Sequence, residues 1–360
     1  MVLWTIMKRE MVRLASRRIY LFMMVIAPVC CFLFFADLFK EGVPTNLPIA
    51  VVDKDNTSTS RSLTRSLDAF GQTEIVMRTG DFSEARKAMQ KGEIYGIFYI
   101  PENFRQEASS GKEPVLSFYT NDSYILPGSL IYKDMRLQAA LANGAVQKAL
   151  LEAKGDTDPR LSARLNPVVV DTHPLNNPWL SYAVYLSNIL LPAFLGMFAM
   201  FVVTYSFGEE LKKGTARELM ALSHDSVLTA VTGKLLPQLL IFMVIGCFCL
   251  ALLYRFLHFP LNSGFFPMFL VMLCLILASQ GFALLMTGIY SRNRIALSTC
   301  ALWSVLSFSV SGFTFPVRSM PEPMQYFVPL FPMRHYYLIY VDQALNGIPL
   351  TKNDNTDHKA

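Results

Sequence analysis

LSYAVYLSNILLPAFLGMFAMFVVTYSF, residues 180–207, contains no Asp, Glu, Lys, Arg or His. A helix needs roughly 20 apolar residues to cross the hydrocarbon core of a bilayer, so this run is long enough to span a membrane. The whole chain of 360 residues is 52% hydrophobic and only 16% charged. This composition favours a membrane protein over an ordinary soluble one.

Further apolar runs complete the predicted membrane region. The candidate spans are Ile19–Leu38, Leu180–Phe207, Leu235–Tyr254, Phe265–Tyr290 and Ile295–Phe315. The first is not a cleaved signal peptide, because the basic residues 1–18 precede it, its apolar run is long, and the A-x-A-like cleavage pattern is missing. All 6 cysteines lie inside these runs, so we expect small packing residues and no structural disulfides. The expected fold is an α-helical polytopic membrane protein.

Residues 1–18 set the predicted orientation of the chain. The basic residues of this segment, against the single acid Glu10, are Lys8, Arg9, Arg13, Arg17 and Arg18. Its apolar residues, placed on a face apart from the arginines, are Leu3, Met7, Met11 and Leu14. This pattern predicts an amphipathic helix lying in the membrane interface. Because cytoplasmic segments carry the excess of Lys and Arg, we expect residues 1–18, 208–234 and 291–294 inside, and 39–179 and 255–264 outside.

Residues 39–179, between the first two spans, are predicted to form an inserted extracytoplasmic α/β domain. Short apolar runs alternate there with helical patterns, as in compact α/β folds. The predicted strands are Pro48–Val52 and residues 73–78, 94–100, 115–120 and 167–170. One predicted helix follows the first strand, a second has Asp81 or Ser83 as its N-cap, and a long one runs from Ser129 to about Lys154.

The sequence shows no catalytic, cofactor-binding or metal-binding constellation. His173 stands alone beside Pro174, and Asp53 and Asp55 follow a strand, where turn residues are the simpler interpretation and metal ligands the alternative. Enzyme and phosphate-loop motifs are missing. No Lys, Arg, Asp, Glu or His lies in the middle of a predicted span, which argues against proton-driven antiport, with a sodium site built from backbone carbonyls as the alternative. We therefore expect no enzyme activity in this chain, and any driving energy must come from another polypeptide.

The charged stretch GEELKKGTARELMA, residues 208–221, separates two of the apolar runs. As a helix it would turn Leu211, Ala216, Leu219 and Met220 to one side. The side chains expected to face the cytosol are Glu209, Glu210, Lys213, Arg217 and Glu218. A short polar helix continuous with two spans is a suitable contact for a cytoplasmic motor protein. The alternative is a solvated loop that simply obeys the charge rule.

With these features the chain resembles the permease subunits of type-2 ABC exporters, in the branch with a large extracytoplasmic domain between the first two spans. The resemblance covers nearly the whole length. It rests on the basic helix before the first span and on the order and spacing of several stretches: PIAVVDKDNTSTS, NNPWLSYAVYLSNILLP, EELKKGTARELMALSHDS followed by TGK, and the late SGFTFPVRSMPEPMQYFVPLFPMRHYYLIYVDQALNG.

The resemblance implies that residues 208–221 are a coupling helix docking into a separate ABC ATP-binding subunit, with residues 1–18 as a second contact. It places this coupling role on Glu209, Glu210, Gly214, Thr215, Glu218 and Leu219. Two permeases, identical or different, and two ATPases would form the working unit in a bacterial inner membrane. Relatives with such a periplasmic domain are often similar to efflux systems for drug-like or lipid-like molecules that use a periplasmic adaptor and an outer-membrane channel.

The late region, residues 316–350, is expected to form short re-entrant helices because five prolines interrupt Phe315–Met333. Arg334 there is interpreted as an interfacial anchor, with a substrate ligand as the alternative. The family normally has a sixth span after NGIPL and a cytoplasmic C-terminus, whereas this sequence ends in the polar TKNDNTDHKA. We favour truncation as the interpretation. The alternatives are that Val328–Leu350 crosses the membrane despite its charges, or that the protein has five spans and its tail lies outside.

The function expected from this resemblance is ATP-driven export of a hydrophobic or amphipathic substrate. A different class of function is the alternative: a membrane-anchored receptor or scaffold that does not transport and acts through its extracytoplasmic domain. A permease would retain its ATP-binding partner without residues 45–175, whereas a receptor would lose its activity.

Overall fold

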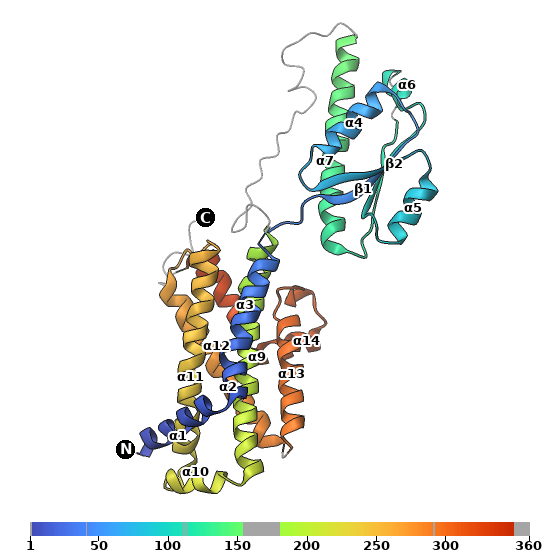
Figure 1. Ribbon diagram of the computed structural model, residues 1–360. Coiled ribbons are helices and arrows are strands. Elements are labelled where there is room, and N and C mark those ends of the chain that lie inside the picture. The colour runs from blue at the N-terminus through green and yellow to red at the C-terminus, as the bar shows by residue number, and fades with distance from the viewer. Residues whose placement is uncertain are drawn as a thin grey trace. The chain divides into compact units, whose positions relative to one another are not determined.

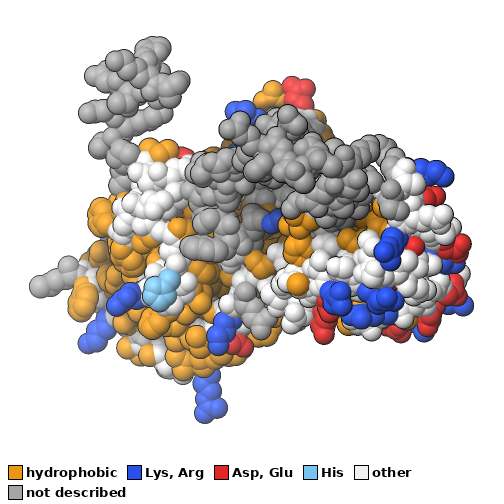
Figure 2. All heavy atoms as spheres, turned by 90° about the horizontal axis from the view of Figure 1, so that it is seen from above, with side chains coloured by type: hydrophobic (Ala, Val, Ile, Leu, Met, Phe, Trp, Pro, Cys, Tyr) orange, Lys and Arg blue, Asp and Glu red, His pale blue; other side chains and the backbone are white. Residues whose placement is uncertain are grey.

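The computed structural model describes residues 2–40, 42–110, 112, 114–153, 181–290 and 292–348. The chain divides into two compact units: Met1–Gly42 with Pro174–Ala360, called here the membrane unit, and Val43–His173, called the outer unit. Figure 1 shows the helices of the first and the small sheet of the second. The exposed side chains of the membrane unit are largely apolar, whereas charged side chains of both signs cover the outer unit (Figure 2).

The described residues of the membrane unit form helices joined by turns and loops, with no strand among them. Its N-terminal helices are α1 (Val2–Ser16), α2 (Arg18–Leu21) and α3 (Ala27–Leu38), the last two joined through a π-helical turn. After the outer unit come α9 (Tyr182–Lys213), α10 (Ala216–Leu222), α11 (Val227–Ala251), α12 (Phe265–Ile289), α13 (Asn293–Ser309), α14 (Glu322–Phe327) and α15 (Pro332–Tyr340). Helix α9 lies at the centre and packs against α3, α11, α12 and α13.

Four helical segments among the described residues are long and apolar enough to cross a membrane: Arg18–Leu38, Tyr182–Lys213, Val227–Phe256 and Phe265–Ile289. The fifth predicted span, Ile295–Phe315, is not among them, so the expected number of spans was too high. Helix α13 has only 17 residues and ends at Ser309. The chain then turns at Gly312, whose φ of 91° is a left-handed conformation that favours glycine.

Residues 316–348 contain several short helices, and three of them have a proline at one of their first two positions. Proline fits the first turn of a helix, where its missing N–H is not needed. Arg334 of α15 is half-buried, and its Nη1 donates to the Ser311 carbonyl over 2.9 Å. This contact ties α15 to the chain just after α13, a structural role that neither sequence interpretation of Arg334 included.

The two chain segments that lead from the membrane unit to the outer unit are held together. The N–H of Tyr182 donates to the Gly42 carbonyl over 2.7 Å. Gly42 has a φ of 74°, and a Cβ at this position would lie 3.0 Å from Ser181 Oγ. The first residues of α9 are therefore joined directly to the segment that follows α3.

The outer unit contains a mixed four-stranded sheet with the strand order β2-β1-β3-β4. The strands are β1 (Leu47–Asp53), β2 (Thr73–Thr79), β3 (Gly96–Ile100) and β4 (Ser117–Thr120). Strand β1 pairs in parallel with β2 and β3, whereas β4 pairs antiparallel with β3. The helices of this unit are α4 (Ser58–Asp68), α5 (Phe82–Gln90), α6 (Phe104–Ser109) and α7 (Ile125–Ala153).

Both faces of this sheet are covered, as expected for parallel strands connected by helices. On one face the strand residues Ile49 and Phe98 pack with Leu67 of α4 and Met135 of α7. On the other face the buried residues are Ala50, Val52, Ala85, Ala88, Ile94 and Ile97. The predicted alternation of strands and helices is confirmed for the described residues. The predicted strand 167–170 and His173 lie outside them.

Local capping explains where the helices of the outer unit begin. Thr57 and Ser60 form a reciprocal capping box at the start of α4, and Asp81 accepts from the Ser83 N–H at the start of α5. Asp53 accepts from the N–H groups of Asp55 and Asn56, both over 3.0 Å, as a turn residue does. The described residues contain no group of His, Cys, Asp or Glu arranged to hold a metal ion.

The core under β3 leaves no room for a side chain at Gly96. A Cβ there would lie 2.8 Å from Ile131 Cγ2 and 2.9 Å from Met135 Cε. We expect Gly96→Ala to destabilise the outer unit by about 1–3 kcal/mol through overpacking. Hydrogen–deuterium exchange of the sheet amides in the full chain measures this loss. Gly71→Ala is the matched control, since nothing lies within 4 Å of a Cβ there. Equal protection in both variants would contradict the packing argument.

Candidate functional site

Helix α1 packs against α11 through one buried face. This face contains Ile6, Glu10 and Leu14, spaced four residues apart as side chains on one side of a helix are. A Cβ at Gly233 of α11 would lie 2.8 Å from Ile6 Cγ2, so the glycine permits the close approach. Of the apolar residues predicted to lie in the membrane interface, Leu14 belongs to this buried face, whereas Met11 is 49% exposed.

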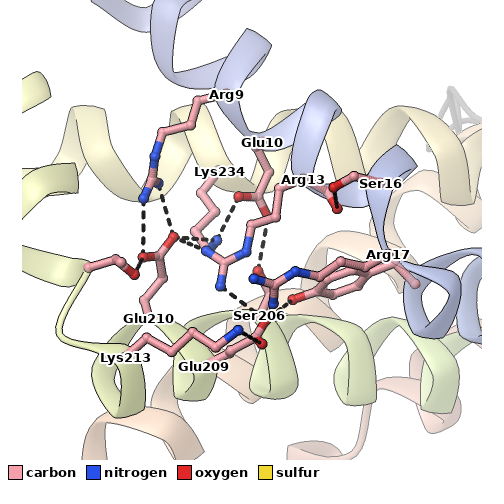
Figure 3. A network of polar contacts seen from close by, with 12 residues as sticks. Arg9, Glu10, Arg13, Ser16, Arg17, Ser206, Glu209, Glu210, Lys213 and Lys234 are labelled. Carbon is pink, nitrogen blue, oxygen red and sulfur yellow. Dashed lines mark hydrogen bonds and ion pairs between the residues drawn. The ribbon is translucent and has the colours of Figure 1, made fainter.

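Two carboxylates at the end of α9 receive the charged face of α1 (Figure 3). Glu209 forms ion pairs with Arg13 (3.1 Å), with Arg17 and with Lys213 (2.7 Å). The hydroxyl of Tyr20 also donates to Glu209, over 3.2 Å. The Glu209 residue is only 9% exposed. The α1–α2 segment therefore encloses this carboxylate with two guanidinium groups and a phenol.

Glu210 is more deeply buried, with 2% of its surface exposed. Its carboxylate pairs with Arg9 over 3.0 Å, with Arg13, and with Lys234 of α11 over 3.2 Å. The hydroxyl of Thr215, which lies between α9 and α10, donates to the same carboxylate. Glu210 thus joins four segments of the chain: α1, α9, the turn before α10, and α11.

Lys234 is fully buried in the second turn of α11. Its Nζ lies 2.7 Å from Glu10 Oε2, which places an acid of α1 against a base of α11. The other oxygen of Glu10 accepts from Ser206 Oγ over 2.9 Å and from Gln238 Nε2 over 3.1 Å. These contacts satisfy a carboxylate that would otherwise be buried without compensation.

We call this set the charged network; its members are Arg9, Glu10, Arg13, Arg17, Tyr20, Ser206, Glu209, Glu210, Lys213, Thr215, Lys234 and Gln238. Figure 3 labels all of them except Tyr20, Thr215 and Gln238. Burial disfavours the cation of Arg13, yet the neighbouring Glu210 and Glu209 carboxylates raise the pKa of Arg13 above its ordinary value. Removing one partner of a buried pair costs about 3–5 kcal/mol. The charged network therefore holds α1, α9 and α11 in one arrangement.

The structure places the six predicted coupling residues in two different environments. Glu209 and Glu210, expected to face the cytosol, are buried in the charged network, so the prediction of their exposure was wrong. Thr215 is half-buried against Glu210, and Leu219 is buried with Ile6 of α1. The two that are exposed are Gly214 and Glu218.

Residues 208–221 are also not one helix. Helix α9 continues through Lys213 and ends at Gly214, whose φ of 71° gives a left-handed C-cap. The short helix α10 begins at Ala216 and presents Arg217 and Glu218 to solvent. The two predicted carboxylates belong to the last turns of a long helix, and the exposed contact surface belongs to the turn and to α10.

Sequence reasoning missed five members of this site: Glu10, Tyr20, Ser206, Lys234 and Gln238. The available signal was a charge that is unusual for its sequence neighbourhood, either opposite in sign to its neighbours or next to an apolar run. Glu10 is the only acid in the basic segment 1–18, and Lys234 directly precedes an apolar run. Opposite charges at two such positions would have suggested an ion pair. The two residues are 224 positions apart in the sequence, however, so no local pattern connects them.

Comparison with known proteins identifies the family of this chain. A family model described as ABC-2 family transporter protein matches residues 18–353. The chain belongs to the ABC-2 transporter family. The probable multidrug ABC transporter permease YbhR of Escherichia coli strain K12 is 23% identical over 337 residues, which cover 93% of this chain and 87% of that protein. The protein of that name from Escherichia coli O157:H7 matches to the same extent.

The chain is therefore a multi-pass membrane permease of an ABC transporter. Membership of this family implies dimerisation and a partner ATP-binding subunit. In this permease the charged network lies between α1 and the last turns of α9, next to the exposed helix α10.

A double-mutant cycle tests the buried pair between Lys234 and Glu10. Lys234→Met leaves two buried carboxylates without their shared cation, and we expect it to lower the stability of the permease by about 3–5 kcal/mol. Glu10→Gln added to Lys234→Met removes one of those charges and should restore part of the loss, so the two effects will not add. Thermal unfolding in detergent, followed by intrinsic fluorescence, measures both.

Lys213→Met is the control for this cycle. Its side chain is 49% exposed, and an exposed ion pair contributes at most about 1 kcal/mol. Strictly additive losses in the double variant would show that Lys234 and Glu10 do not interact.

Proposed function

We propose that this permease is the membrane-spanning subunit of an ATP-driven exporter of hydrophobic or amphipathic molecules, with ATP hydrolysed on a separate partner subunit. The observation that carries the proposal is the charged network, which connects the exposed α10 region to the long membrane helices. The family match supports a permease over a receptor or scaffold. The name of the relative from Escherichia coli supports a drug-like substrate for this chain.

Force from an ATP-binding subunit would enter at the exposed residues of the turn and α10. Gly214 and Glu218 provide the docking surface, together with Lys212 and Arg217, which are also exposed. The buried Glu210 and its partner Thr215 receive the displacement. Helix α9 has 32 residues, so at 1.5 Å per residue a rigid shift at Lys213 reaches about 48 Å along the chain.

The charged network extends this displacement to two other helices. Arg9 and Arg13 connect Glu210 to α1, and Lys234 connects it to α11. Leu219 of α10 packs with Ile6 of α1 and completes the connection on the apolar side. A movement of α10 therefore cannot leave α1, α9 or α11 unchanged without separating buried charges.

The proposed location is a bacterial inner membrane. The basic α1 and the α10 region would face the cytoplasm, because positive charge concentrates on that side. The outer unit would then be periplasmic. A periplasmic adaptor and an outer-membrane channel are part of this proposal, as is a homo- or heterodimer of permeases as the working form.

Buried polar groups among the membrane helices support an amphipathic substrate. Ser279 and Gln280 of α12 are at most 1% exposed. The Ser279 hydroxyl and both polar atoms of the Gln280 amide have no hydrogen-bond partner among the described residues. Such groups are costly in an apolar environment until a polar group, water or another chain reaches them.

Glu218→Lys tests the coupling proposal without disturbing the charged network. The Glu218 side chain is 67% exposed, and its pair with Arg9 at 3.8 Å is weak. We expect the rate of ATP-dependent efflux and the amount of co-purified ATP-binding subunit each to fall about tenfold. An effect of this size is typical when a charge at the centre of an interface is reversed. Charge reversal at Glu209 or Glu210 is less informative, because it would also break buried ion pairs.

Glu322→Lys is the matched control, an exposed acid of α14 in the late region. It should bind the ATP-binding subunit like the unmodified permease. Wild-type efflux and co-purification of the Glu218→Lys protein would remove α10 as the docking surface.

A further inference from the structure

The outer unit contains a hollow of about 460 Å³ at the carboxyl ends of the parallel strands β1 and β2, beside α4. Val51 and Asp53 line it from β1, Thr79 from β2, and Thr64 from α4. The volume lies within the range of small-molecule sites.

Three arginines from two elements line this hollow. Arg61 and Arg65 are four residues apart on α4 and so lie on the same face of that helix, while Arg78 comes from the end of β2. Arg61 Nη1 donates to the Asn56 carbonyl over 3.0 Å. Arg78 lies 3.6 Å from Asp68 in an exposed pair. The Arg65 guanidinium has no ion pair among the residues that the structure describes.

Asp53 is the one acid among the residues lining the hollow, and its oxygens are already used. Oδ1 accepts from the N–H groups of Asp55 and Asn56, and Oδ2 accepts from Ser60 Oγ over 2.6 Å. This carboxylate holds the turn before α4. Among the residues that line the hollow, three arginines stand against this one carboxylate, a surplus of two positive charges. Asp68 lies outside the lining and pairs at the surface with one of the three, Arg78.

A second hollow of about 540 Å³ beside α6 provides a contrast, because its charges are balanced. Lys54 lies 3.8 Å from Glu102, and Asp55 accepts from the backbone N–H of Arg105 over 3.3 Å. Two cations there face two acids, so the second hollow offers no surplus charge to an anion. The distinction between the hollows rests on charge and on what each carboxylate already binds.

We propose that the hollow at Arg61, Arg65 and Arg78 binds a phosphate monoester. A monoester dianion matches the surplus of two positive charges, which a carboxylate monoanion does not. The planar fork of arginine forms paired hydrogen bonds to phosphate oxygens, which adds geometric fit to the attraction. The phosphate belongs to a soluble metabolite or to a lipid headgroup. This site is independent of the coupling role proposed for α10.

Binding measurements on the full chain in phosphatidylcholine nanodiscs test the site. One probe is 2-naphthyl phosphate, with 2-naphthol and 2-naphthoate as its neutral and monoanionic counterparts. The other is dioctanoyl phosphatidic acid below its micelle concentration, against dioctanoyl phosphatidylcholine. We expect at least one phosphate monoester to bind, and more tightly than its counterparts. Binding should weaken as sodium chloride is raised, since the arginines are exposed.

Arg65→Ala is the decisive variant, because the Arg65 side chain forms no hydrogen bond or ion pair among the described residues that the fold would lose. Loss of one charged hydrogen-bonding group should weaken phosphate binding about tenfold. Arg65→Lys keeps the positive charge but loses the planar guanidinium, so its affinity for phosphate should lie between those of the unmodified chain and the Arg65→Ala variant. Arg86→Ala, on the exposed side of α5, is the matched control and should bind as the unmodified chain does.

The outcomes separate the two sources and decide the proposal. Arg65-dependent binding of naphthyl phosphate supports a soluble monoester, and the same dependence for phosphatidic acid alone supports a lipid headgroup. Failure of both phosphates to bind would overturn the proposal. So would equal binding of naphthoate and naphthyl phosphate, or an unchanged affinity in a folded Arg65→Ala protein.

Discussion

The arrangement of the membrane unit depends on the buried contact of Lys234 with Glu10 and Glu210 (Figure 3). A fully buried ammonium ion is strongly unfavourable unless acids surround it, so α11 must remain beside both α1 and α9. The acids need the contact as well. Glu209 and Glu210 lie in the last turns of α9, where the helix dipole disfavours negative charge. The arginines of α1 offset this disadvantage.

This constraint changes the interpretation of the N-terminal helix. A basic amphipathic helix before a span suggests attachment to the membrane surface, and Trp4, at 70% exposed, is a suitable side chain for that purpose. The arginines, however, point into the protein and form ion pairs with α9. Helix α1 therefore serves as a structural component of the permease. Because its ion pairs are partly or fully buried, added salt screens them less than it screens surface pairs.

The sequence predicts those parts of the fold that local patterns determine. Long runs without charge identify α3, α9, α11 and α12 as spans, and alternating strand and helix patterns identify the outer unit. It does not predict the burial of Glu209 and Glu210, because Arg9 lies 201 residues before Glu210 and charged side chains are expected to be exposed. The sequence also does not predict that α13 ends at Ser309, shortly before the left-handed turn at Gly312.

The joined segments at Gly42 and Tyr182 have a consequence for how such permeases diversify. The chain leaves the helical bundle and returns to it at neighbouring points, fixed by the hydrogen bond between the Tyr182 N–H and the Gly42 carbonyl. Domains whose two ends lie close together are tolerated as insertions, because they do not strain the host fold. One insert could thus replace another at this position during evolution while the charged network and the helices stay as they are.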